Sequence, residues 1–195
     1  MNIEISWDLN TFFILSQIFT VFAYVALGAT YIVRTRNQIL IFVCISIILQ
    51  GFAYFFLSAW TAFWMVGIAL FRTVAFFVHD KVNKKADKTK ITIFDTIIFS
   101  LVVVGSIVVS IFAFEGFWSL FAIFGTVLYS FSIYQKSIKM YRILAVPVET
   151  LWIVYLVFVA SPFGILLETL LLGVAIASIV FYGIIEKISQ KQKSD

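Results

Sequence analysis

The sequence from Ile97 to Val109 reads IIFSLVVVGSIVV and contains no charged residue. Wound into a helix, this stretch presents apolar side chains on every side, as a helix surrounded by lipid does. A membrane-spanning β-strand would instead alternate polar and apolar residues over about ten positions. The stretch therefore predicts an α-helix that crosses a bilayer.

The whole chain shares this character. Hydrophobic residues make up 63% of its 195 residues and charged residues 12%, against about 45–50% and about 25% in soluble domains. Its mean hydropathy is +1.08. Because one span takes about 20 residues, the chain has room for roughly seven or eight spans and no soluble domain. The net charge of +4 does not indicate nucleic-acid binding, since no water-soluble basic face exists to carry it.

Seven apolar stretches are long enough to span the bilayer. They are Thr11–Val33, Ile39–Leu57, Trp60–Val78, Thr92–Phe114, Phe117–Tyr134, Ile143–Ala160 and Gly164–Ile185. We expect an all-α integral membrane protein with a single transmembrane domain over residues 1–195. Its expected parts are a first three-helix unit (11–78), a linker helix (92–114), a second three-helix unit (117–185) and a cytoplasmic tail (186–195).

The basic residues predict the orientation, because Lys and Arg in short loops stay on the cytoplasmic side. Of the 14 Lys and Arg residues, all but Arg72 follow the first, third, fifth and seventh stretches, and the N-terminus and the other three breaks hold none. In order they are Arg34 and Arg36; Lys81, Lys84, Lys85, Lys88 and Lys90; Lys136, Lys139 and Arg142; and Lys187, Lys191 and Lys193. This alternation predicts seven spans with the N-terminus outside and the C-terminus inside.

A weak internal repeat groups the stretches further. When Ser16 is set against Ser119, Tyr31 falls on Tyr134 and the basic break after the first stretch falls on the break after the fifth. Two three-helix units separated by one linker helix have the same orientation in the membrane. The repeat therefore predicts a parallel three-plus-one-plus-three bundle.

Several short motifs follow one another along the chain. They are Tyr54-Phe55-Phe56-Leu57, Arg72-Thr73, Phe124-Gly125-Thr126, Met140-Tyr141-Arg142, and Trp152, Ser161, Gly164 and Glu168. In this order and spacing they resemble the bacterial YgjV-type inner membrane proteins. The resemblance runs from about residue 15 to 185, and it implies a multi-pass protein of the bacterial inner membrane. That family is distantly similar to the SWEET, PQ-loop and PnuC transporters, which implies a SWEET-like bundle and a sugar, nucleoside or other metabolite as cargo.

Charged residues inside the apolar stretches are the strongest site candidates, because each costs a few kcal/mol unless it is paired or hydrated. Arg72 and Glu149 lie at similar depths, so they could form an ion pair. Such a pair would either bridge the two halves or belong to a solute or ion site. Asp95, soon after the lysine-rich break, is expected to be a helix-start acid.

Glu168 lies near the outer end of its stretch, where no basic residue can neutralise it. It would either face water or bind a proton, as in a proton-coupled carrier, or serve as a structural acid. Trp152, Tyr155 and Tyr54 would suit a pocket that stacks on a sugar or base, or would only pack. Pro147 is a hinge candidate or a tolerated kink.

The sequence offers no sign of an enzyme, a cofactor or a metal site. The single His79 lies in a basic break, the single Cys44 in an apolar stretch, and no cluster has metal-ligand spacing. The leading hypothesis is a small-solute transporter that works by alternating access. The alternative is a non-transporting structural or assembly protein. The expected partners are the lipid bilayer and a small polar solute but no nucleic acid, and a homo-oligomer stays open.

Overall fold

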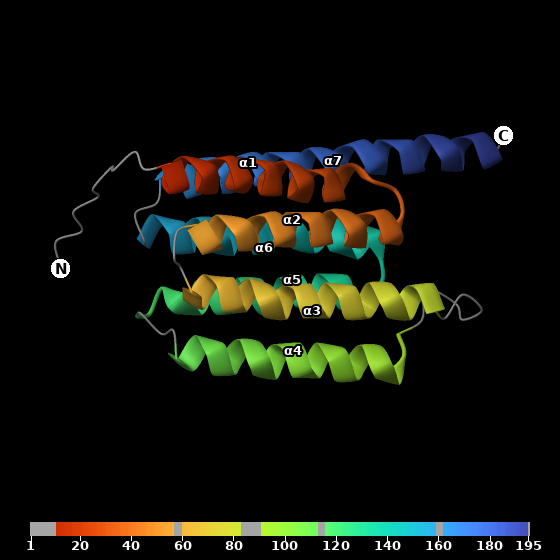
Figure 1. Cartoon of the computed structure of the whole chain (residues 1–195). Helices are drawn as coiled ribbons and strands as arrows, with labels where there is room; N and C mark the ends of the chain where they lie inside the picture. Colours follow the sequence, from red (N-terminus) through yellow and green to blue (C-terminus); the bar gives the residue numbers. More distant parts are fainter. Residues whose placement is uncertain (1–10, 57–59, 83–90, 113–115, 159–161, 195) are drawn as a thin grey trace.

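The computed structural model describes residues 11–56, 60–82, 91–112, 116–158 and 162–194. This part of the chain forms seven α-helices and no strand (Figure 1). The helices are α1 (Thr11–Ile32), α2 (Arg36–Phe56), α3 (Trp60–Val82), α4 (Ile93–Phe112), α5 (Ser119–Tyr134), α6 (Ile138–Phe158) and α7 (Pro162–Ser194). The all-helical prediction is confirmed for these residues.

Each predicted span corresponds to one helix, although the ends differ. The helices α2, α6 and α7 begin at Arg36, Ile138 and Pro162, before the apolar stretches that predicted them. Apolar length measures only the part inside the hydrocarbon, whereas backbone hydrogen bonding continues among polar residues beyond it. The helix α5 begins later than predicted because residues 116–118 form a turn. The predicted loop lysines Lys84, Lys85, Lys88 and Lys90, and Ser161, lie outside the described residues.

Four of the helices are apolar and long enough to cross a membrane by length and composition. They are α1, α2, α6 and the Phe163–Ile185 part of α7. Within α4 and α5 the apolar segments are shorter, at Ile93–Val109 and Ser119–Tyr134. The structure is therefore a membrane-type helical bundle.

The helices form two layers with α4 at one edge. Each helix packs against the next in the chain, and α7 closes the ring against α1. Figure 1 shows α1, α2 and α3 side by side in one layer, with α7, α6 and α5 behind them and α4 below α3 and α5. Residues far apart in sequence thus meet along the seam between the layers.

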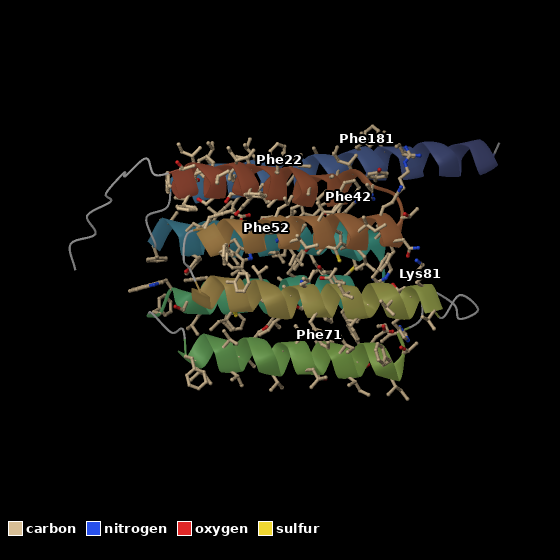
Figure 2. All side chains as sticks on the ribbon, in the orientation of Figure 1. Phe22, Phe42, Phe52, Phe71, Lys81 and Phe181 are labelled. Carbon is tan, nitrogen blue, oxygen red and sulfur yellow. The ribbon has the colours of Figure 1, made fainter. Side chains whose placement is uncertain are left out.

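The exposed and buried residues are inverted relative to a soluble protein. Phe22, Phe71 and Phe181 point outward with more than half of their surface exposed (Figure 2). Arg72 and Glu149, in contrast, are each only 2% exposed. Large apolar side chains face outward all along the helices, which suits contact with lipid tails.

One end of the bundle, which we call the basic end, holds Arg34, Arg36, Lys136 and Arg142 at the ends of α1, α2, α5 and α6. There Arg142 binds the last carbonyl groups of α1. Its Nε donates to the oxygen of Tyr31 at 3.0 Å and its Nη2 to that of Val33 at 2.7 Å. The guanidinium also lies 3.6 Å from the ring centroid of Tyr182 on α7. The arginine therefore joins three helices where α1 leaves four carbonyl groups without intrahelical partners.

We expect Arg142→Gln to lower the free energy of unfolding by roughly 2 kcal/mol, because two charge-assisted hydrogen bonds are lost. Arg142→Lys should recover only part of this, since an ammonium group lacks the planar fork that reaches both carbonyls. Thermal unfolding of the purified protein in detergent measures both variants. Equal stability of the wild type and Arg142→Gln would show that these contacts contribute nothing.

Candidate functional site

Glu149 lies near the middle of α6, nine residues before its last residue, Phe158. The hydroxyl group of Tyr31 on α1 donates a hydrogen bond to its Oε1. The side chain is 2% exposed. A carboxyl group is thus held at the seam between the two layers, about midway along a membrane-type helix.

Glu168 on α7 has a similar arrangement. The hydroxyl group of Tyr24 donates to its Oε1 at 2.8 Å, and the residue is 6% exposed. Tyr24 and Tyr31 are seven residues apart, two turns of α1, so both hydroxyls leave the same face of that helix. The second oxygen, Oε2, is buried and accepts no hydrogen bond in the described part of the chain.

The two carboxyl groups lie within hydrogen-bonding reach of one another. None of the ion pairs among the described residues includes either of them. The predicted ion pair between Arg72 and Glu149 is therefore wrong for this structure. Glu149 is turned toward α1 and α7, whereas Arg72 is turned toward α5, so their similar depth does not bring them together.

Arg72 on α3 has polar but uncharged neighbours. Its Nη1 donates to Oγ of Ser130 on α5 at 2.5 Å, and its guanidinium lies 5.2 Å from the ring centroid of Tyr129. Its Nε is buried and finds no acceptor among the described residues. An arginine stays charged at any ordinary pH, so this position holds a buried positive charge without a carboxylate.

Hydroxyl groups connect the two regions. The hydroxyl of Tyr129 is 3.5 Å from that of Tyr141, and Tyr141 is hydrogen-bonded to Oγ1 of Thr30 at 2.8 Å. The rings of Tyr141 and Tyr31 are adjacent, with centroids 5.7 Å apart. A row of polar side chains thus crosses the seam from Arg72 toward the carboxyl pair.

The predicted aromatic residues contact one another and the helices next to α6. Trp152 and Tyr155 make an edge contact on α6, with centroids 5.8 Å apart. The side chain of Tyr54 on α2 interacts electrostatically with both Tyr155 and Glu168. Trp152 also packs on α5, where a Cβ at Gly125 would lie 3.2 Å from the indole Nε1. The structure therefore brings Tyr54 near Glu168 and Tyr155, whereas Trp152 packs on Tyr155 and α5, and Arg72 lies apart.

Pro147 lies inside α6, two residues before Glu149. A proline has no N–H to donate to the carbonyl four residues earlier, which weakens the helix locally. This keeps Pro147 a hinge candidate for the segment that carries Glu149.

At the basic end, a second group of side chains that we call the ionic cluster links four helices. Its members are Arg36, His79, Asp80, Asp95 and Lys136. Nε of Arg36 lies 2.6 Å from Asp80, and Nζ of Lys136 lies 2.5 Å from Asp95 and 3.5 Å from Asp80. Nδ1 of His79 is 3.2 Å from Asp95. The sequence did not predict this cluster, because its members come from separate basic breaks and helix ends.

Asp95 also lies in the first turn of α4 and caps the start of that helix. Its Oδ2 accepts from the backbone N–H and the hydroxyl of Thr92, both at 2.8 Å, while its own N–H points back to Oγ1 of Thr92 at 3.3 Å. This is a capping box, and it confirms that Asp95 is a helix-start acid. Lys136, its ionic partner, follows Gln135, the C-cap of α5, and has a φ of +58°, a left-handed conformation in which glycine is usual.

His79, Asp80 and Asp95 also have the donor types of a metal site, with ligand atoms within 4.8 Å of one another. The spacing of these residues in the sequence did not predict that grouping. Both oxygens of Asp80 and Oδ2 of Asp95 are, however, already paired with Arg36 or Lys136. Each carboxylate therefore already has a cationic side chain as its partner.

The family model of Imp-YgjV, described as a bacterial inner membrane protein, matches residues 14–183. The chain belongs to this family. It is therefore a bacterial inner membrane protein, as the short motifs and the hydropathy predicted. No curated protein and no solved structure matches it.

In this Imp-YgjV protein, the sequence predicted Arg72, Glu149 and Glu168 as charged residues inside the membrane. It did not predict the residues that form hydrogen bonds with them. Tyr24 and Tyr31 are two turns apart on α1, and this spacing is the one signal that could have pointed to a shared polar face. The contribution of Ser130 to the arginine site has no comparable signal, because a serine in a spanning helix commonly bonds its own backbone.

We expect Asp95→Ala to lower the free energy of unfolding by about 1 kcal/mol more than Asp95→Asn does. Asparagine keeps an acceptor for the capping box and loses only the charge facing Lys136, whereas alanine loses both. Thermal unfolding in detergent gives the comparison. If the two variants are equally stable, the cap contributes nothing and only the ion pair matters.

Proposed function

We propose that this Imp-YgjV protein moves a small polar solute, of the sugar, nucleoside or metabolite class, across the bacterial inner membrane by alternating access. The observation that carries the proposal is the arrangement of its buried charges. Glu149 and Glu168 lie together, and Arg72 lies elsewhere beside uncharged partners. A side chain that serves only to hold helices together is expected to have its charge neutralised by its neighbour.

The cost of this arrangement favours a function over a purely structural role. A charge in the bilayer interior costs about 2.5–3.5 kcal/mol even on insertion scales, and two carboxyl groups in contact add repulsion. Residues that lower the stability of a fold tend to lie at its functional sites. In a structural protein, apolar residues at these three positions would pack the helices at lower cost.

In our proposal the two units that move are α1–α3 and α5–α7, joined by α4 in a parallel three-plus-one-plus-three, SWEET-like plan. In support, α1, α2 and α3 run in the same directions as α5, α6 and α7 (Figure 1). A two-fold axis along the bundle would bring α1 onto α5, α2 onto α6 and α3 onto α7, as a parallel repeat requires.

The proposed solute site is the seam between the layers. Arg72 would bind a polar or anionic group, because its Nε has no acceptor among the described residues. Tyr54, Trp152 and Tyr155 would contact the apolar faces of a ring, and Pro147 would let α6 bend. In this proposal the protein is not an enzyme, takes no cofactor, binds no nucleic acid, and has the bilayer and the solute as its partners.

Flux assays in proteoliposomes with a panel of sugars, nucleosides and polar metabolites test the proposal. We expect Arg72→Gln, Glu149→Gln and Glu168→Gln to fold, with at least one losing about tenfold of its flux. A loss of about 1.4 kcal/mol in solute binding suffices for that factor. Glu186→Gln is the matched control, because this residue follows the apolar segment of α7 that ends at Ile185.

The alternative is a non-transporting protein in which the same residues lock the helices together. It is favoured if no solute crosses with the wild type and each variant at the three sites only lowers the unfolding temperature. The ionic cluster gives this alternative its best support, since it joins four helices through neutralised charges.

We further propose seven spans with the basic end in the cytoplasm. In a Cys44→Ser background, a membrane-impermeant maleimide should label Phe117→Cys in intact spheroplasts and Thr35→Cys only after lysis. Phe117 is 63% exposed and lies at the end opposite Arg36. The reverse labelling pattern would invert the orientation, in conflict with the positions of the basic residues.

A further inference from the structure

The carboxyl pair has a second property besides its burial. Each carboxyl group accepts a hydrogen bond from a tyrosine hydroxyl group on α1. Tyr31 donates to Glu149, and Tyr24 donates to Glu168. The two groups also lie within hydrogen-bonding reach of one another. Two ionised carboxylates have only acceptor oxygens and cannot hydrogen-bond. One proton between them changes a repulsion into an O–H···O⁻ bond, which is among the stronger hydrogen bonds.

Among the described residues, the surroundings of the pair supply no compensating positive charge. The described titratable groups that face it from the packed helices are tyrosines, namely Tyr24 and Tyr31 on α1, Tyr54 on α2, Tyr129 on α5 and Tyr141 on α6. No described lysine or arginine forms an ion pair with either carboxyl group. A proton is thus the available means of reducing the negative charge at this depth.

The geometry points to a single proton-binding site formed by Glu149 and Glu168, whose proton couples solute movement to the proton gradient. The proton is taken from water on one side, binds one carboxylate oxygen, and is shared with the other carboxylate. It returns to water as an intact proton when the pair becomes hydrated from the opposite side. The balance of this step requires no other reactant.

The place of the pair in the fold explains how movement would control the proton. Both tyrosine donors belong to α1 in the first unit, while both carboxyl groups belong to α6 and α7 in the second. Any displacement of one unit against the other moves the tyrosine hydroxyl groups away from the carboxyl pair and lets water reach it. Hydration favours the ionised form of the pair. The coupling part of this inference rests on the proposed transport function, whereas proton binding itself does not.

Infrared spectroscopy of the protein in lipid tests proton binding. At neutral pH we expect the C=O stretching band of a protonated carboxylic acid in the wild type and its loss in Glu149→Gln/Glu168→Gln. The control Glu186→Gln should keep the band. Tyr24→Phe leaves both carboxyl groups in place and should shift the band, because it removes one hydrogen bond. This variant tests the site even if the double variant does not fold.

An absent band in the wild type, or an unchanged band in the folded double variant, overturns the proton site. A band that does not move in Tyr24→Phe also contradicts it, because the hydrogen bond from Tyr24 would then not touch the protonated pair.

Coupling is tested in proteoliposomes that contain the pH indicator pyranine. For each sugar, nucleoside or metabolite of the flux panel that crosses, an inward solute gradient should change the internal pH with the wild type and not with the double variant. Solute flux without a pH change overturns the coupling and leaves the transporter proposal intact. Absence of flux for every solute overturns the transporter and the coupling together, and the infrared result then decides the proton site alone.

Discussion

The hydrocarbon of a bilayer offers no hydrogen-bond partner, so every polar group at that depth must find one inside the protein. This constraint sorts the residues of the bundle. Phenylalanines such as Phe22 and Phe181 lie outside, and the acidic and basic side chains turn to the seam between the layers. The tyrosines of α1 follow from the same constraint, because a hydroxyl group can donate to a carboxyl without adding a charge. The seam is therefore both the polar interior of the protein and the place where its two layers meet.

The two ends of the bundle are held together differently. At the basic end, the ionic cluster and Arg142 join helices through ion pairs and bonds to helix carbonyls. At the opposite end, aromatic rings stack, as Phe12 does on Phe56 and Phe121 on Phe158. Contacts among charges weaken when water enters, whereas stacked rings are stabilised by excluding water. The two ends are therefore stabilised by different physical interactions.

The charges at the centre set this protein apart from a simple helical anchor. The charges of the ionic cluster form ion pairs. Among the described residues the carboxyl pair and Arg72 form none, and Oε2 of Glu168 and Nε of Arg72 are buried without a hydrogen-bond partner. Such positions are costly, and the surrounding hydroxyl network of Thr30, Tyr129 and Tyr141 offsets the cost only in part. In the proposed function, these atoms are the ones that a proton or a polar solute would bind.

The sequence alone determined the membrane class, the seven helices apart from the extension of α7 to Ser194, and the burial of Arg72, Glu149 and Glu168, because hydropathy is a local property that run length reports directly. It also placed Asp95 at a helix start, since a capping box involves neighbours three residues apart. It did not predict that Asp80, Lys136 and Arg142 are buried. Only the tertiary structure decided the partners. Arg72 and Glu149 share a depth but face different helices, and the pairing of Glu149 with Glu168 depends on how α6 and α7 are rotated against α1. That rotation is set by side-chain packing among distant segments, which no local pattern records.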